Sequence, residues 1–328
     1  MRPPAVFVMR PASLVRQIFD AEATAELAEM LDIDPEHTIT DLASAESRLR
    51  LRRAEVVIGG WGAEPISTEL AASVRAVIYA GGVAATCLDR PADFAARGVV
   101  AANARSANAV PVAEYALAMI LLANKQTFAA ERAYRGTRQA PDRATQLTDV
   151  GNYRRTVGIV GAGLIATELI GRLRGFDLDV IVFDPLLTAD RAARLGVRRG
   201  SLREVMATSD VVSLHQAVTP ETVGQIDAHL LGLMRDGATL LNTARGAVVD
   251  QQALVAELRT GRIHAVLDVT EPEPLPADSE LWQVPNLVLT PHIAGSMGNE
   301  LHRIGASVVA EVRRFVAGEP FEHPEKLG

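Results

Sequence analysis

Three apolar, strand-like segments in the second half of the chain are each followed directly by polar residues that could do acid–base chemistry. Arg245 follows LLNTA, Glu271 and Glu273 follow VLDVT, and His292 follows LVLTP. In an open α/β sheet, ligands bind beyond the carboxyl ends of the strands, so these side chains should converge. Interconverting a 2-keto acid and a 2-hydroxy acid needs a cation for the substrate carboxylate and carbonyl, which suits Arg245. It also needs a group that gives or takes the hydroxyl proton, which suits His292.

A carboxylate beside the histidine would orient the imidazole and stabilise its protonated form, which is the form that a keto-acid reduction requires. The segment EPEPLP offers both Glu271 and Glu273 for this role, and the residues alone leave the choice open. Taken singly, an arginine or a histidine after a strand more often makes a surface ion pair or packs in a core. Their occurrence together with a nucleotide-binding turn favours a catalytic site.

The stretch VGIVGAGLIATELIGRL is typical of that turn, with Ala166 in place of the third glycine of G-x-G-x-x-G. Gly161 would make the tight turn and Gly163 would let the backbone approach a pyrophosphate, whereas the third glycine only eases helix packing. Asp184 ends the next strand, LDVIVFD, where a carboxylate binds the adenosine ribose and repels a 2′-phosphate. No arginine follows until Arg191, so the sequence predicts NAD rather than NADP.

Composition excludes several classes of protein. A formal net charge of −7 over 328 residues, without a basic stripe, argues against a nucleic-acid partner. Because Cys87 is the only cysteine, neither a disulfide framework nor a thiolate metal site can form, and no metal is expected. The apolar runs 5–9 and 115–123 are too short for a signal peptide and a membrane span respectively. We therefore expect a cytoplasmic protein with no membrane partner.

Apolar runs that read as strands alternate with helical patterns in two series, which predicts α/β architecture with two doubly wound parallel sheets. The first series contains AVFV, EVVIGG, RAVIYA and GVVAAN, and the second contains TVGIV, LDVIVFD, DVVSLH, ATLLNTA, IHAVLDV and NLVLTPH. Residues 13–31 form an acidic amphipathic stretch and residues 108–124 a long helix, whereas residues 134–155 look like an irregular loop. Residues 296–316 have the period of one helix, whose domain the sequence leaves open.

Six motifs together resemble the D-isomer-specific 2-hydroxyacid dehydrogenase family, which includes glyoxylate, hydroxypyruvate and phosphoglycerate reductases. They occur in the family's order from about Val77 onward: NARSANAVPVAEYALAMILLANK, VGIVGAGLIA, SDVVSLHQAVTPET, LLNTARGAVVDQQALVAEL, LDVTEPEPLP and LTPHIAGS. In the family, the acid partner of the histidine lies five residues after the Asp of the L-D-V segment. The resemblance therefore selects Glu273, and it implies that Arg245 binds the substrate and that His292 is the proton donor.

The resemblance also implies a Rossmann-type NAD-binding domain over residues 105–295 and a flavodoxin-like, discontinuous substrate domain over residues 1–104 and 296–328. Dimers are usual in the family, so a homodimer is expected. Further cofactor contacts are implied as well. Leu164 and Ile165 would lie at the pyrophosphate turn and His215 near the adenosine. Thr243 would lie near the nicotinamide, Asp268 at the nicotinamide amide and Gly295 beside the cofactor.

The substrate side departs from the family pattern. In VIYAGGVAATCLD, Ala84 and Thr86 stand where relatives commonly have a second glycine and an Asp. Backbone amides at Gly81, Gly82 and Val83 are still expected to meet a substrate carboxylate.

The loop GGWGAEPI carries Trp61 and Gly62 where phosphoglycerate enzymes tend to have arginines, which disfavours a phosphorylated substrate. Trp61 could equally be a packed loop aromatic. Pro111 and Ala217 also differ from common family residues. Formate dehydrogenases place Gln at the position of Glu273, so that activity is not expected.

The resulting hypothesis is an NAD-dependent reductase that converts a small, unphosphorylated 2-keto acid into its D-2-hydroxy acid. The alternative is an NAD(H)-sensing binding protein similar to the C-terminal-binding-protein corepressors, in which the same scaffold serves protein partners. A third possibility is an NADP enzyme, which would require a remote arginine to displace the influence of Asp184.

Overall fold

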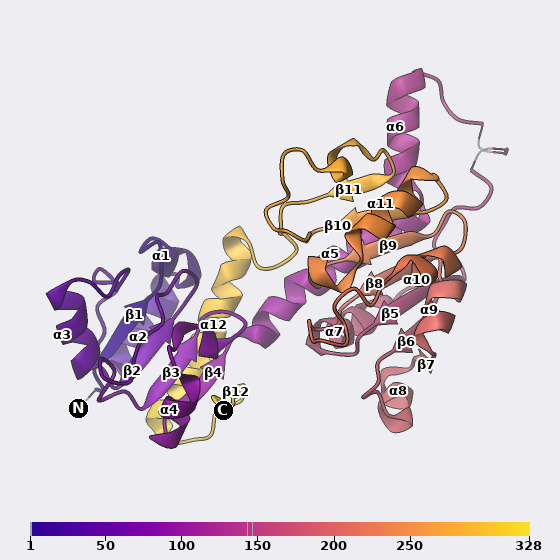
Figure 1. Cartoon of the computed structure of the whole chain (residues 1–328). Helices are drawn as coiled ribbons and strands as arrows, with labels where there is room; N and C mark the ends of the chain where they lie inside the picture. Colours follow the sequence, from indigo (N-terminus) through magenta and orange to yellow (C-terminus); the bar gives the residue numbers. More distant parts are fainter. Residues whose placement is uncertain (1, 143, 146) are drawn as a thin grey trace. The chain divides into compact units, whose positions relative to one another are not determined.

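The alternating apolar runs fold into two separate sheets, each in its own unit. The computed structural model describes residues 2–142, 144–145 and 147–328. Unit 1 comprises Met1–Asn108 and Ser296–Gly328, and unit 2 comprises Ala109–Gly295 (Figure 1). Arg143 and Gln146, which belong to the predicted loop 134–155, lie outside the described residues.

The sheet of unit 1 contains four parallel strands, as the first apolar series predicts. They are β1 (Ala5–Val8), β2 (Val56–Gly59), β3 (Ala76–Tyr79) and β4 (Val100–Asn103), and β12 (Pro324–Glu325) adds an antiparallel edge. Two parallel bridges, Pro4 to Asp32 and Val8 to Ile39, place segment 32–39 on the other side of β1. The strand order therefore reverses at β1, as in a flavodoxin-like sheet.

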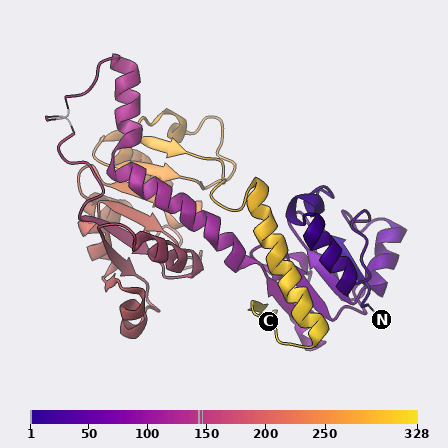
Figure 2. The same ribbon diagram turned by 180° about the vertical axis from the view of Figure 1, so that it is seen from behind.

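Side chains alternate between the two faces of this sheet, so that each face builds its own core. One face packs on α1 (Leu14–Ile18), α2 (Ala21–Met30) and α12 (Leu301–Ala317), and the other on α3 (Ala45–Arg53), η1 (Ala84–Cys87) and α4 (Pro91–Ala96). Figure 2 shows α12, in yellow, alongside α2. The C-terminal helix, whose domain the sequence left open, therefore belongs to unit 1.

The sheet of unit 2 contains seven parallel strands in the order β11-β10-β9-β8-β5-β6-β7. Their bounds are β5 (Arg155–Val160), β6 (Leu178–Phe183), β7 (Arg198–Arg199), β8 (Val211–Leu214), β9 (Thr239–Asn242), β10 (His264–Leu267) and β11 (Leu287–Leu289). The chain direction across the sheet reverses between β5 and β8. That reversal is the point at which doubly wound sheets bind nucleotides, and it confirms the predicted Rossmann-type fold.

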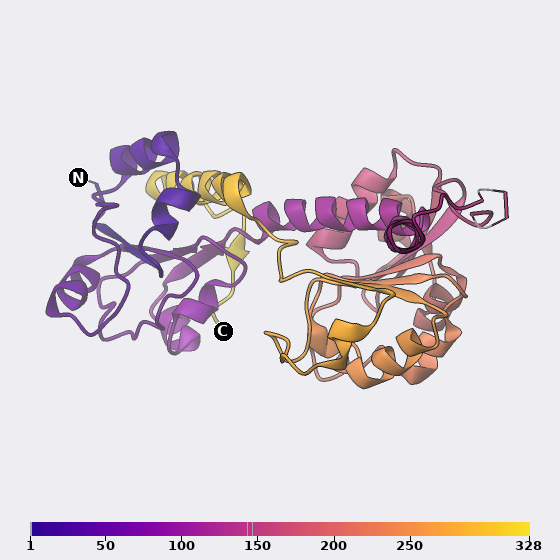
Figure 3. The same cartoon turned by 90° about the horizontal axis from the view of Figure 1, so that it is seen from above.

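Helices cover both faces of this second sheet (Figure 3). The core of one face includes α5 (Arg105–Asn124), α7 (Leu164–Leu173) and α8 (Ala189–Leu195), with Phe128 of α6 (Thr127–Thr137) packed against it. The other face holds α9 (Leu202–Thr208), α10 (Ala228–Leu233) and α11 (Gln251–Arg259). Short 3-10 turns complete the chain at η2 (Gly246–Val248), η3 (Glu280–Gln283) and η4 (Gly298–Glu300).

Helix α5 is long and apolar enough to span a membrane by length and composition alone. In this fold, however, Ala113, Ala116 and Ile120 of α5 pack into the core of unit 2. The apolar character of the helix is therefore explained by core packing.

Two parts of the secondary structure differ from expectation. The stretch 13–31 is two helices, because the Asp20 side chain accepts a hydrogen bond from the Ala23 amide and starts α2 anew. The predicted loop 134–155 begins inside α6, which extends to Thr137. No residue of α6 is fully buried, and its last four residues belong to the polar, arginine-rich stretch that reads as a loop.

Candidate active site

The predicted catalytic residues follow three strands that are neighbours in the sheet of unit 2. Arg245 lies just after β9, Glu273 lies in the loop after β10, and His292 lies just after β11. Because β9, β10 and β11 run parallel and adjacent, their carboxyl ends share one edge of the sheet. All three residues therefore belong to the same edge of unit 2.

Glu273, and not Glu271, contacts the histidine. The His292 Nδ1 lies 2.6 Å from the Glu273 Oε1, which resolves the choice that the residues alone left open. The backbone of His292 has a left-handed φ of 54°, and its amide donates to the carbonyl of Asp268 at 2.9 Å. With Nδ1 held, Nε2 remains for chemistry, since it makes no hydrogen bond within the described part of the chain.

Asp268 fixes the turn that carries the histidine. Its buried carboxylate accepts hydrogen bonds from the Thr290 hydroxyl at 2.6 Å and from the amides of Ile293 and Ala294, both at 2.9 Å. The Tyr115 hydroxyl lies 2.7 Å from the Thr290 Oγ1 and extends this network into α5. Both oxygens of Asp268 thus serve the protein backbone, a positioning role that the sequence did not reveal.

Arg245 is exposed at the start of η2, in a turn braced by Asn242. The Asn242 side chain donates to the carbonyl of Arg245 at 2.8 Å and accepts from the Ala244 amide at 3.0 Å. The position after Arg245 must be glycine, because a Cβ added to Gly246 would lie 2.0 Å from the carbonyl carbon of Thr270. This close approach brings the Arg245 turn against the segment that leads to Glu273. Asn242 could have been noticed as a polar residue ending an apolar strand.

The nucleotide turn has the backbone that its glycines predict. Gly161 has a φ of 92°, and an added Cβ would lie 2.7 Å from the amide of Gln216. Gly163 precedes the first turn of α7, where the amides of Leu164 and Ile165 belong to the unpaired group that binds phosphates at helix N-termini. Ala166 is fully buried in the core without disturbing the turn.

Asp184 lies at this turn, and so does Arg191, although it is far from the turn in sequence. The Asp184 Oδ2 accepts from the Ala162 amide at 2.6 Å, and Oδ1 accepts from the Leu186 amide at 2.7 Å. The Arg191 Nη2 donates to the carbonyl of the same Ala162 at 2.6 Å. Arg191 reaches the turn despite its distance in sequence, so that distance is no argument against NADP. The argument for NAD from this turn is left with the carboxylate of Asp184.

Several enclosed polar atoms near the turn have no partner within the described residues. They are the His215 Nδ1, the Thr243 Oγ1 and both side-chain polar atoms of Gln216. Burial lowers the pKa of His215 to about 4, so the ring is neutral at pH 7, with Nε2 2.8 Å from the Ser213 Oγ. Buried polar atoms are seldom left unpaired. A bound dinucleotide would supply partners here, so these residues fit NAD, and Gln216 is a cofactor candidate that the sequence did not indicate.

The predicted substrate residues Trp61, Gly81, Gly82 and Val83 lie in unit 1, in the loops after β2 and β3. An added Cβ at Gly81 would lie 3.5 Å from the Trp61 Cε2, so the indole adjoins this loop. The Gly81 amide donates to the Tyr79 carbonyl at 2.8 Å. This amide is therefore already paired, contrary to the expectation that it meets a substrate carboxylate. The amides of Gly82 and Val83 have no partner among the residues that the structure describes.

Arg10 is a further residue of this region that sequence reasoning missed. Its amide donates to the Trp61 carbonyl at 2.9 Å. Its guanidinium is exposed and, across the described ranges, makes no hydrogen bond or ion pair. Arg10 therefore adds an exposed cation to the segment beside Trp61.

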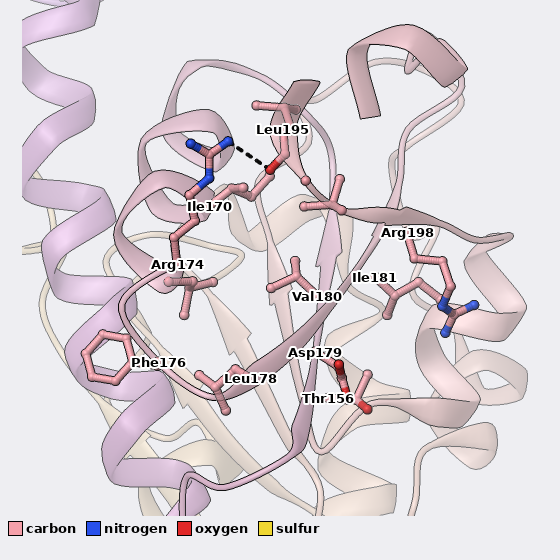
Figure 4. A pocket seen from close by; sticks show the side chains of 13 residues that line it. Thr156, Ile170, Arg174, Phe176, Leu178, Asp179, Val180, Ile181, Leu195 and Arg198 are labelled. Atoms are coloured by element: carbon pink, nitrogen blue, oxygen red, sulfur yellow. Dashed lines mark hydrogen bonds between the residues drawn. The ribbon is translucent and has the colours of Figure 1, made fainter. Parts of the chain in front are cut away.

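Gly295 is the last residue of unit 2 and follows Ala294, whose amide Asp268 binds. A cavity of about 500 Å³ in the same unit lies elsewhere, lined in part by Leu173, Leu178 and Val180. Figure 4 shows it near the first residues of β6, with Arg174 donating to the carbonyl of Leu195. Asp184 follows the other end of β6, and no predicted site residue lines this cavity. It is therefore separate from the candidate site.

Comparison with known proteins identifies relatives of the chain. Residues 117–294 match the model of the D-isomer specific 2-hydroxyacid dehydrogenase NAD-binding domain. D-3-phosphoglycerate dehydrogenase of Mycobacterium leprae is 36% identical over 227 residues, which cover 68% of this chain and 42% of that protein. Glyoxylate reductase of Korarchaeum cryptofilum is 34% identical over 225 residues, which cover 68% of each.

Among solved structures, a phosphoglycerate oxidoreductase from Rhizobium etli has a TM-score of 0.83 at 25% identity, covering 99% of this chain and 98% of that one. This chain spans less than half the length of the phosphoglycerate dehydrogenase from Mycobacterium leprae. The family model nevertheless covers more than half of the chain, and it covers the strands that carry Gly161, Arg245, Glu273 and His292. The chain therefore belongs to the D-isomer specific 2-hydroxyacid dehydrogenase family, and unit 2 is its NAD-binding domain.

Proposed function

We propose that the protein is an NAD-dependent dehydrogenase that interconverts a small, unphosphorylated 2-keto acid and its D-2-hydroxy acid. The observation that carries this proposal is the 2.6 Å contact between His292 and Glu273, at the sheet edge that also carries Arg245. A histidine held by a carboxylate, with one ring nitrogen left over, is suited to general acid–base chemistry.

The side chains divide the work as follows. Arg245 binds the substrate carboxylate through its planar guanidinium and draws electron density from the keto oxygen. Glu273 holds Nδ1 and stabilises the doubly protonated ring, so that Nε2 donates the proton that the reduced oxygen needs. NAD, when bound, supplies the hydride donor or acceptor. In the oxidative direction, His292 is neutral at Nε2 and takes the hydroxyl proton.

The substrate class is proposed from the loops of unit 1. The free amides of Gly82 and Val83 are suited to a carboxylate, and Trp61 beside Gly81 is suited to a short carbon chain. Among the described residues near these loops, the Arg10 guanidinium makes no hydrogen bond or ion pair, whereas that of Arg105 already donates to the Gly82 carbonyl. A phosphate dianion is usually held by several charged donors. The relatives named phosphoglycerate dehydrogenase point to a phosphorylated substrate, and the one named glyoxylate reductase points to an unphosphorylated one.

A substrate panel tests the proposal directly. NADH oxidation would be followed with glyoxylate, hydroxypyruvate, a branched 2-keto acid and phosphohydroxypyruvate, and the chirality of the product would be determined. We expect the highest kcat/KM for an unphosphorylated acid and a D product. A preference for phosphohydroxypyruvate would contradict the substrate class. Tight NADH binding without turnover on any acid would favour a sensor.

We also propose a homodimer that functions in the cytoplasm. The exposed apolar residues Leu122, Tyr134 and Tyr153, on or near α5 and α6, support an interface on unit 2. The single Cys87 is buried, and burial raises the pKa of its thiol to about 12. An unreactive lone thiol is suited to a reducing compartment.

A further inference from the structure

The loop 81–88 of unit 1 contains the amides that are proposed to bind the substrate carboxylate. It is held by Glu325, from the C-terminal part of the chain. The Glu325 Oε2 accepts from the Ala84 amide at 2.8 Å, and its Oε1 accepts from the Ala85 amide at 3.0 Å. Strand β12 places Glu325 there, because Glu325 pairs in antiparallel register with Ala101 of β4. Leu327, 6% exposed, anchors the tail in the core behind η1.

The same carboxylate belongs to a short network that reaches the other side of the loop. The Asn103 Nδ2 donates to the Glu325 Oε2 at 2.6 Å, while the Asn103 Oδ1 accepts from the Arg105 amide at 3.1 Å. The Arg105 Nε in turn donates to the Gly82 carbonyl at 3.0 Å. Arg105 thus binds the Gly82 carbonyl, and Glu325 binds the Ala84 amide. The free amides of Gly82 and Val83 lie in the short segment between these two contacts.

The loop itself offers no carboxylate for this purpose. Between Gly81 and Leu88 there is no acidic residue, and Thr86 uses its hydroxyl on the Val83 carbonyl at 2.6 Å. The first amides of a helical turn have no acceptor within the turn. An anion is a strong acceptor for such amides. Glu325 therefore supplies, from the C-terminal tail, an acceptor that the residues of the loop do not provide.

We propose that Glu325 is a positioning residue for the substrate, because it fixes the conformation in which the amides of Gly82 and Val83 are presented. This inference rests on the proposed function, which gives the amides of that loop, besides Arg245, a part in binding the substrate carboxylate. Removing the carboxylate leaves the Ala84 and Ala85 amides without an acceptor, so the loop rearranges. KM for the 2-keto acid should rise about tenfold or more. The affinity for NADH and kcat at saturating acid should stay close to the wild-type values.

The experiment compares Glu325→Ala and Glu325→Gln in the full chain. Glu319→Ala is the matched control, because Glu319 is an exposed carboxylate of the same tail whose ion pair with Arg314 is 3.5 Å long. KM, kcat and the NADH dissociation constant would be measured. Hydrogen exchange at the amides of Ala84 and Ala85 would be followed by mass spectrometry. Glu325→Gln keeps one carbonyl acceptor, so its KM and exchange rates should lie between wild type and Glu325→Ala.

The outcomes separate this inference from the proposed function. Unchanged exchange at Ala84 and Ala85 in Glu325→Ala would overturn the role of Glu325 whether or not the enzyme turns over. Faster exchange with an unchanged KM would show that the loop does not position the substrate, and would overturn the inference equally. A wild-type protein that reduces no 2-keto acid would refute the proposed function, and the substrate role of Glu325 with it. If Glu325→Ala unfolds, the same readings on Glu325→Gln decide.

Discussion

At the scale of single residues, proton transfer depends on which glutamate braces the imidazole. His292→Ala should lower kcat by about two to four powers of ten, because the general acid is lost. Glu273→Gln should lower kcat by a smaller factor, because an amide cannot stabilise the protonated ring as a carboxylate does. Glu271→Gln is the matched control, since Glu271 contacts Gln251 only through its backbone amide. Steady-state kinetics with a saturating acid measures all three, and equal losses in both glutamate variants would contradict the assignment.

Cofactor choice is also decided by single residues at the nucleotide turn. Asp184→Ala should raise the ratio of kcat/KM for NADPH to that for NADH, by about tenfold or more, because the carboxylate that repels a 2′-phosphate is gone. Arg191, which binds the Ala162 carbonyl, should then contribute to phosphate binding. Arg191→Ala in the same background should therefore reduce the gain. An unchanged cofactor ratio in Asp184→Ala would show that another group discriminates.

Site residues that belong to a sequence motif could be predicted, whereas contacts between residues far apart in the sequence could not. The glycines of the turn, Arg245 and His292 follow strands that are recognisable in the sequence, so their edge of the sheet could be predicted. Glu273 required the spacing that the family resemblance supplies. Arg191 and Glu325 lie far from their partners in sequence. Arg191 reaches the turn through α8 and Glu325 reaches the loop through β12, and no local pattern encodes either approach.

At the scale of elements, the end of β8 should make stability depend on pH. Burial lowers the pKa of His215 to about 4 from an ordinary value near 6.5. Between pH 6.5 and pH 4, the histidine is therefore protonated in the unfolded chain but neutral in the folded chain. Protonation then favours the unfolded chain, so this contribution to stability is present above pH 6.5 and is lost as the pH falls towards 4. His264, whose pKa burial and Arg132 also lower, acts in the same direction.

Denaturant unfolding at pH 7, 6 and 5 measures this effect. His215→Gln should lose less stability between pH 7 and pH 5 than the wild type does, because glutamine does not titrate. His302→Gln, which replaces an exposed histidine of α12, should follow the wild type. A His215→Gln curve parallel to the wild type would show that the ring is not held neutral by burial.

The elements themselves were predictable in proportion to their burial. The ten strands read from the sequence are short apolar runs, and each is present. Strands β7 and β12 have two residues each, which is too short for any period. Segment 32–39 joins its sheet through two bridges only, and α6 buries none of its residues. For β7, β12 and segment 32–39, pairing with a neighbouring strand rather than local pattern decides the structure.

At the scale of the whole molecule, the two units differ in their match to the model of the NAD-binding domain. That model covers residues 117–294, which are almost the whole of unit 2, whereas unit 1 lies outside it. The nucleotide turn and the Arg245, Glu273 and His292 group belong to the matched part. Ala84, Thr86, Trp61 and Glu325 belong to the other. Specificity for the acid should therefore change with unit 1, while cofactor use should change with unit 2.

Assembly is the remaining property of the whole molecule that the surface of unit 2 predicts. Tyr134 of α6 is 57% exposed although it is aromatic, and Leu122 and Tyr153 are exposed as well. A charge placed in an apolar interface must be desolvated, so Tyr134→Glu should convert a dimer into a monomer. Val223→Glu is the matched control, since Val223 is also 57% exposed but lies in the loop after β8. Light scattering after size-exclusion chromatography gives the mass of each, and a wild-type monomer, or a dimer that survives Tyr134→Glu, would show that α6 is not the interface.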